Sequence, residues 1–125
     1  MDNTIFQGTQ IVSSASTSEP AKRRIAFKMK LHKGFKEEYK KRHHNLWPEL
    51  EALLKSSGIS EYSIFFDEKT NSLFGIMNSG NQQSLNDLPN HPVMKKWWAY
   101  MKDIMDTNED NSPISVPLQE VFYLP

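Results

Sequence analysis

Residues 35–54, FKEEYKKRHHNLWPELEALL, decide the fold of this chain. An α-helix turns about 100° per residue, and at that spacing the aromatic and aliphatic residues of the segment share one arc of roughly 120°. The residues on this arc are Phe35, Tyr39, His43, Leu46, Trp47, Leu50, Leu53 and Leu54. The other faces carry mainly Lys, Arg and Glu, which is the pattern of a helix with one buried side. His43 therefore lies on the face that the helix must bury, one turn after Tyr39.

Pro48 interrupts this helical segment. Proline has no amide hydrogen to donate to the carbonyl of His44, and it disfavours the helical conformation of the residue before it. The sequence therefore predicts a kink or break at Leu46–Trp47, with Pro48 opening the second half. A break at this point would loosen the packing beside His43 and could leave a hollow there.

The composition is that of one globular domain of 125 residues. The 15 Lys and Arg balance the 15 Asp and Glu, so the charge favours neither nucleic acid nor an anionic membrane as a partner. The absence of cysteine excludes disulfides, thiolate catalysis and cysteine-ligated zinc. No apolar run approaches the roughly 20 residues that a membrane-spanning helix needs.

Residues 1–22 differ in composition from the rest of the chain. They are rich in Ser, Thr, Asn and Gln, and they lack the basic start and the sustained apolar core of a signal peptide. We predict a disordered N-terminal tail over residues 1–22 and a folded domain over residues 23–125. A targeting segment is the alternative for the tail.

The remainder of the chain contains further strands and a second helix. Apolar residues recur with the period of two that is typical of strands in residues 24–31, 61–66, 73–77 and 118–124. A second amphipathic helix begins near His91-Pro92, and the polar residues 78–90 before it predict a loop with one helical turn. The order strand, helix, strand, strand, helix, strand predicts an α+β fold of the ferredoxin-like βαββαβ type.

The later predicted strands carry large apolar side chains on both faces. Phe65 points away from Ile64 and Phe66, and Val121 likewise points away from Phe122. Two helices can cover only one face of a four-stranded sheet, and the chain has no second sheet for the other face. This pattern predicts a homodimer in which two sheets pack face to face.

His43 could share a pocket with four aromatic residues that have polar tips: Tyr39, Tyr62, Trp97 and Trp98. Such rings stack on the C–H faces of a pyranose, while their tips hydrogen-bond its hydroxyl groups. Trp97 and Trp98 point about 100° apart on a helix, so one should anchor it while the other reaches a rim, a pocket or a partner. An aromatic core with a dimer seam is the alternative. The chain has no HExxH, glycine-rich phosphate loop or GxSxG motif, so metal, nucleotide and serine-nucleophile chemistry lack support.

Three long segments make residues 24–125 resemble the L-rhamnose mutarotase family. They are EEYKKRHHNLWPELEALLKSSGISEYSIFFD at 37–67, VMKKWWAYMKDIMDTNEDNSP at 93–113 and LQEVFYLP at 118–125. The resemblance implies a dimeric α+β barrel in which two ferredoxin-like subunits pack sheet to sheet. It also implies a cytoplasmic isomerase of rhamnose metabolism, without metal or other cofactor, that opens and recloses L-rhamnopyranose to interconvert its α and β anomers.

The resemblance also implies residue roles. His43 matches the family's proton donor, and the sugar-contacting positions fall at Tyr39, Tyr62, Trp97 and Trp98. This chain has His44-Asn45 where the family pattern has Asn-Pro, so His44 is the alternative proton donor. The complementary base stays open among Tyr39, a water molecule, Asp103 and Glu120.

Two other functions are compatible with the same predicted fold. Cofactor-free monooxygenases and haem-degrading enzymes also use dimeric α+β barrels, but they need a wide apolar or haem-sized cavity. A non-catalytic sugar-binding module would bind rhamnose without accelerating anomer exchange.

Overall fold

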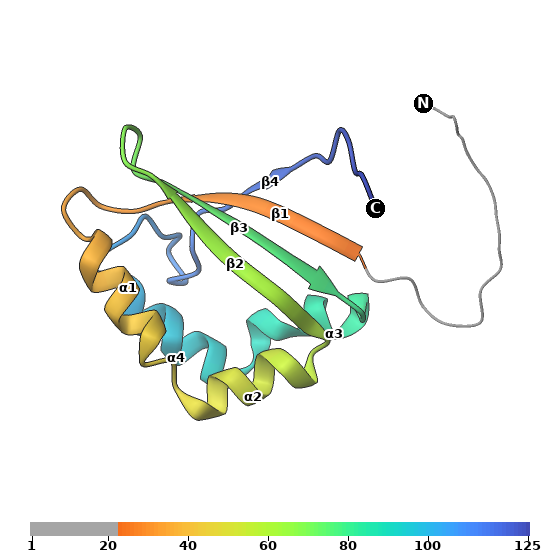
Figure 1. Cartoon of the computed structure of the whole chain (residues 1–125). Helices are drawn as coiled ribbons and strands as arrows, with labels where there is room; N and C mark the ends of the chain where they lie inside the picture. The colour runs from red at the N-terminus through yellow and green to blue at the C-terminus, as the bar shows by residue number, and fades with distance from the viewer. Residues whose placement is uncertain (1–22) are drawn as a thin grey trace, which may run out of the picture.

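The chain forms a four-stranded antiparallel sheet with its main helices on one face (Figure 1). The structure is a computed structural model and describes residues 23–125, so the predicted tail over residues 1–22 lies outside the described residues. The strand order is β2-β3-β1-β4, and the first and last strands therefore meet in the sheet. This order confirms the predicted ferredoxin-like α+β fold.

The elements follow the predicted sequence, with two short helices added. They are β1 (Arg23–Lys30), α1 (Lys36–His44), α2 (Pro48–Ser56), β2 (Ile59–Asp67), β3 (Ser72–Ser79), α3 (Gln82–Asp87), the 3₁₀ helix η1 (Leu88–Asn90), α4 (Pro92–Met101) and β4 (Val116–Leu118). Residues 78–90 thus contain more helix than predicted. The Asn81 side chain caps α3 by accepting a hydrogen bond from the Ser84 amide at 3.0 Å, a local signal that favours a helix start. Within residues 23–125, no helix is both long enough and apolar enough to cross a membrane.

The predicted break in the first helix is confirmed. α1 ends at His44, Trp47 is extended at φ −61° and ψ 132°, and Pro48 occupies the first turn of α2. Because proline has no amide hydrogen, it is tolerated in the first turn of a helix and not in the middle of one. The break lets α2 take its own direction beneath the sheet (Figure 1).

The core lies between the inner face of the sheet and the helices. The strand register places Phe66, Leu73 and Met29 side by side across β2, β3 and β1. The buried apolar residues that pack there include Met29, Leu31, Tyr39, Leu50, Leu73, Met94, Trp97, Met101, Ile104 and Met105. The prediction that Phe35 is buried is wrong, because it lies before the first turn of α1 and exposes 37% of its surface.

Gly75 accommodates an aromatic ring from the neighbouring strand. It lies opposite Phe27 in the register of β1 and β3, and a Cβ atom at position 75 would lie 2.5 Å from Cζ of Phe27. A glycine inside a strand often marks a place where another group approaches the backbone closely. The structure assigns that space to Phe27.

The predicted strand over residues 118–124 is wrong in its extent. β4 covers only Val116–Leu118, and it pairs with β1 through Ala26, Phe27 and Lys28. Beyond Leu118 the chain leaves the sheet, and Val121 and Phe122 are 92% and 77% exposed. An alternating pattern specifies which faces of a strand differ, but the strand forms only where a neighbouring backbone supplies hydrogen bonds.

Candidate functional site

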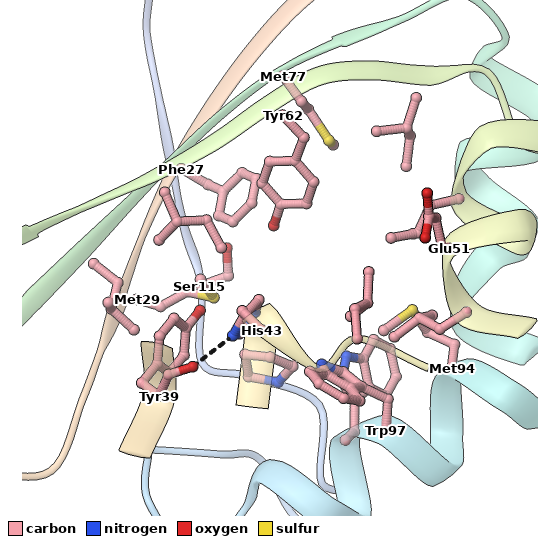
Figure 2. A pocket seen from close by; sticks show the side chains of 18 of the residues that line it. Phe27, Met29, Tyr39, His43, Glu51, Tyr62, Met77, Met94, Trp97 and Ser115 are labelled. Carbon is pink, nitrogen blue, oxygen red and sulfur yellow. Dashed lines mark hydrogen bonds between the residues drawn. The ribbon is translucent and has the colours of Figure 1, made fainter. Parts of the chain in front are cut away.

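A cavity of about 960 Å³ lies between the inner face of the sheet and the helices. Its volume falls within the range of about 300–1,000 Å³ that is usual for small-molecule sites. The cavity is lined by all five residues singled out from the sequence: Tyr39, His43, Tyr62, Trp97 and Trp98. They come from α1, β2 and α4, so the fold brings together side chains that are up to 59 positions apart in the sequence. Figure 2 shows His43 between Tyr39 and Trp97 at one wall.

The hydrogen bond of His43 fixes its tautomer. Nδ1 lies 3.0 Å from the backbone carbonyl oxygen of Tyr39, one turn earlier in α1 (Figure 2). A carbonyl oxygen only accepts hydrogen bonds, so Nδ1 carries the proton and donates it. In the neutral ring, Nε2 is then left as a lone-pair acceptor that can take up a proton.

The protonation state of His43 follows from its surroundings. Burial lowers the pKa of His43 below its usual value of 6.5, and the neighbouring charge of His44 lowers it further, while the backbone hydrogen bond at Tyr39 opposes both effects. His43 is therefore neutral at pH 7. A neutral imidazole in a cavity is suited to act first as a base and then, once protonated, as an acid.

Aromatic rings hold His43 from two sides. The Tyr39 ring stacks on the imidazole with a centroid distance of 4.2 Å, and the Trp97 ring meets it edge-on at 5.4 Å. Tyr39, His43 and Trp97 together form one wall of the cavity, the histidine wall. Trp97 also contacts Trp47, with a centroid distance of 5.1 Å, so this wall continues to the helix break. Trp97 is buried, whereas Trp98 is half-buried and lines the cavity. This division confirms that one tryptophan anchors α4 while the other reaches a pocket.

The two tyrosines remain neutral at physiological pH. Burial raises the pKa of Tyr39 well above its usual range, with a smaller contribution from the charge of Tyr62. Burial also raises the pKa of Tyr62 to about 12; its residue surface is 38% exposed, but its hydroxyl group points into the cavity (Figure 2). Neutral phenols can donate and accept hydrogen bonds, but they do not serve as phenolate bases near pH 7.

The structure also places the other candidates for acid–base chemistry. Neither Asp103 nor Glu120 lines the cavity. Asp103 accepts two hydrogen bonds from Arg42, at 2.9 and 3.2 Å, and this hydrogen bonding lowers the pKa of Asp103. Glu120 lies in the exposed C-terminal segment. His44, the alternative proton donor, is exposed and also lines the cavity.

Sequence analysis missed polar residues of the cavity wall, among them Glu51 and Ser115. Glu51 of α2 lines the cavity, although it lies off the predicted apolar arc and pairs with Lys55 at 2.9 Å. Ser115 lines the cavity from the loop before β4 (Figure 2). That loop has no periodicity, so no local pattern identified Ser115. Within residues 23–125, no group of three or more His, Asp or Glu side chains could hold a metal ion.

Comparison with known proteins gives one consistent family. The family model for L-rhamnose mutarotase matches residues 24–124. The chain is 57% identical over 101 residues to the L-rhamnose mutarotase of Formosa agariphila, covering 81% of this chain and 97% of the relative. It is 54% identical over 101 residues to the L-rhamnose mutarotase of Sinorhizobium fredii, with the same coverage.

Solved structures show a similar fold. The crystal structure of the Formosa agariphila L-rhamnose mutarotase superposes with a TM-score of 0.78 and 56% identity, covering 82% of this chain and 99% of that one. A Bacteroides thetaiotaomicron protein described as an antibiotic biosynthesis monooxygenase superposes with a TM-score of 0.54 at 11% identity, covering 81% and 90%. The second likeness concerns the fold alone.

Proposed function

The chain belongs to the L-rhamnose mutarotase family, and we propose that it interconverts the α and β anomers of L-rhamnopyranose in the cavity around His43. The observation that carries this proposal is the neutral imidazole with its Nδ1 proton engaged and its Nε2 lone pair available. Ring opening of a sugar requires one proton to leave the anomeric hydroxyl and one to arrive at the ring oxygen. A single histidine near neutrality is suited to both transfers.

The proposed proton path starts from the neutral form of His43. Nε2 takes the proton of the anomeric hydroxyl while the bond between C1 and the ring oxygen breaks and a carbonyl forms at C1. The resulting imidazolium gives its proton to the ring oxygen, which is bonded to the same carbon in the closed sugar. Rotation about the C1–C2 bond and the reverse transfers close the other anomer. His43 thus becomes the proton donor implied by the resemblance, after it has accepted a proton.

We assign the aromatic residues to substrate binding. Tyr62 and Trp98 line the cavity beyond the histidine wall, where rings can stack on the C–H faces of the sugar. The neutral hydroxyl groups of Tyr39 and Tyr62 can hydrogen-bond the sugar without competing for its protons. Trp97 is largely buried, so its main part is to hold His43, and only its edge is available to the sugar.

We also propose that two copies of the chain pack through the outer faces of their sheets. The register places Phe65, Phe74, Lys28 and Val116 in one row across that face. Phe65 is 61% exposed and Val116 is 49% exposed. Figure 1 shows no helix over this side of the described chain. Burial of such a row in a second sheet would remove apolar surface from water.

The C-terminal segment after Leu118 supports the same proposal. Its side chains at Val121, Phe122 and Leu124 are at least 77% exposed, and Arg24 lies 5.0 Å from the Tyr123 ring. Arg24 shares the outer face of β1 with Lys28, so this exposed apolar segment lies beside the face that a second copy would cover. Sedimentation at micromolar concentration tests the dimer, and Phe65→Asp should shift it towards monomer. A wild-type monomer in that experiment would reject this part of the proposal.

Saturation-transfer NMR at the anomeric protons tests the activity. We expect the protein to accelerate exchange between the two anomers of L-rhamnose, with L-fucose and L-mannose as comparisons for selectivity. Binding of L-rhamnose without faster exchange would instead favour a sugar-binding module. Oxygen uptake with an aromatic substrate would favour a monooxygenase. The cytoplasmic location implied by the resemblance belongs to the same proposal, and cell fractionation tests it.

A further inference from the structure

Arg42 makes a dense set of contacts outside the cavity, immediately before His43 in the sequence. Its side chain is only 10% exposed. Nη1 and Nη2 donate to the two carboxylate oxygens of Asp103 at 2.9 and 3.2 Å, and Nη1 also donates to the carbonyl oxygen of Tyr100 at 2.8 Å. Nε donates to Glu38 at 2.8 Å. The guanidinium carbon lies 4.4 Å from the centroid of the Tyr100 ring. One side chain thus joins the last turn of α1 to the C-terminal end of α4.

Helix α1 has little else to hold its position. Tyr39 is its only buried residue, and no side chain caps its N-terminus. Phe35, just before it, is partly exposed, and the chain breaks immediately after His44. A nine-residue helix of this kind depends on tertiary contacts, because isolated helices of this length are unstable in water. Besides the exposed pair of Lys36 with Glu68 and the contact of His43 with Trp97, the position of α1 therefore depends on Tyr39 and Arg42.

The contacts of Arg42 lead to the histidine wall. Tyr100, under the guanidinium, packs on Trp97 at 5.6 Å, and Trp97 meets the imidazole of His43 at 5.4 Å. His43 comes from α1 and Trp97 from α4, so their geometry depends on how the two helices are joined. A bidentate contact between a guanidinium and a carboxylate fixes distance and angle together, which a lysine cannot do.

We infer that Arg42 is a positioning residue for anomer exchange: its clamp on Asp103 and Tyr100 holds α1 against α4 and so aims His43 at the sugar. The inference rests on the proposed function, since it presumes that His43 moves the proton. It also gives Asp103 a role that differs from the complementary base considered from the sequence. Arg42 and Asp103 do not line the cavity, so neither is expected to touch the sugar.

The test uses three single variants and one double variant of the full chain. Arg42→Lys keeps the charge but loses the bidentate contact of the guanidinium group with Asp103. Asp103→Asn removes the charge of an exposed carboxylate that does not line the cavity. Each should lower kcat for anomer exchange by about 10–100-fold, because a misplacement of about 1 Å costs roughly 100-fold. The Kd of L-rhamnose should change little. The double variant should be no slower than the slower single variant, because both substitutions break the same clamp.

Glu68→Gln is the matched control. Glu68 accepts a hydrogen bond from Lys36 at 3.2 Å and so pairs with the other end of α1, in an exposed position outside the cavity. This substitution also removes one carboxylate charge from an ion pair of α1, but it leaves the Arg42 clamp intact. It should leave kcat unchanged.

A second readout does not depend on activity. In the protein without sugar, the ring current of Trp97 shifts the NMR signals of the His43 ring protons. This ring-current shift should become smaller in Arg42→Lys and Asp103→Asn but stay unchanged in Glu68→Gln. Folded variants with unchanged kcat would overturn the inference, as would a loss of kcat with unchanged His43 shifts. If the wild-type protein does not exchange the anomers of L-rhamnose, the proposed function fails by itself. The His43 shifts would then decide alone whether the clamp positions the ring, and unchanged shifts would reject it.

Discussion

Replacement of His43 by alanine separates a catalytic histidine from a core histidine. The imidazole is part-buried between Tyr39 and Trp97 and makes one backbone hydrogen bond. Its loss should cost about 1–3 kcal/mol of stability, towards the lower end because the space left behind opens into an existing cavity. If His43 moves the proton, exchange should slow by about 10²–10⁴-fold, which corresponds to about 3–5 kcal/mol in the barrier.

These magnitudes make the two explanations distinguishable. A domain with about 5 kcal/mol of stability would keep at least 2 kcal/mol after the substitution, so more than about 95% of the protein would stay folded. Unfolding could then remove only a few per cent of the activity. Thermal unfolding and saturation-transfer exchange are measured on the same samples, with His44→Ala for comparison, which should slow exchange far less. A folded His43→Ala protein with unimpaired exchange would refute the assignment of His43.

Four further predictions follow from particular features of the chain. Burial lowers the pKa of His43 below 6.5, so the unfolded chain binds the proton first as the pH falls. Urea denaturation should therefore show full stability above pH 6.5 and a decline in stability as the pH falls from there to the lower folded pKa. This pH-dependent part of the stability should be absent in His43→Gln. Gly75→Ala should lower stability by about 1–3 kcal/mol, because the new methyl group would clash with the Phe27 ring. A smaller side chain at position 27 should restore part of that stability. If calorimetry shows no such restoration, the packing argument is wrong. Tyr62→Phe should raise the Kd of L-rhamnose more than it lowers kcat, because the neutral hydroxyl group only binds the sugar. A fall in kcat with an unchanged Kd would instead give the Tyr62 hydroxyl a part in proton transfer. Deletion of residues 1–22 should leave melting temperature and exchange rate unchanged, and a truncated chain that fails to fold would show that the tail is structural.

The sequence by itself determined the main helices, the presence of four strands and their order along the chain. The helical spacing of Tyr39 and His43, the break before Pro48 and the period of two in the strands are local properties, because each depends on backbone geometry over a few residues. The five candidate site residues were also found from sequence. Their residue types and the family resemblance singled them out, and the ferredoxin-like fold then brings α1, β2 and α4 around one cavity.

Only the tertiary structure decided which residues meet across the fold. The clamp of Arg42 on Asp103 joins positions 61 residues apart, and the entry of Glu51 into the cavity depends on the direction that α2 takes after the break. The end of β4 at Leu118 depends on which backbone lies beside it. Pairings of this kind are set by long-range packing and hydrogen bonding, and the sequence near each residue carries no periodic signal for them. The tautomer of His43 rests on a contact within α1, from Nδ1 to the Tyr39 carbonyl, but the imidazole is held in that orientation between the Tyr39 ring and Trp97 of α4, which only the fold brings there.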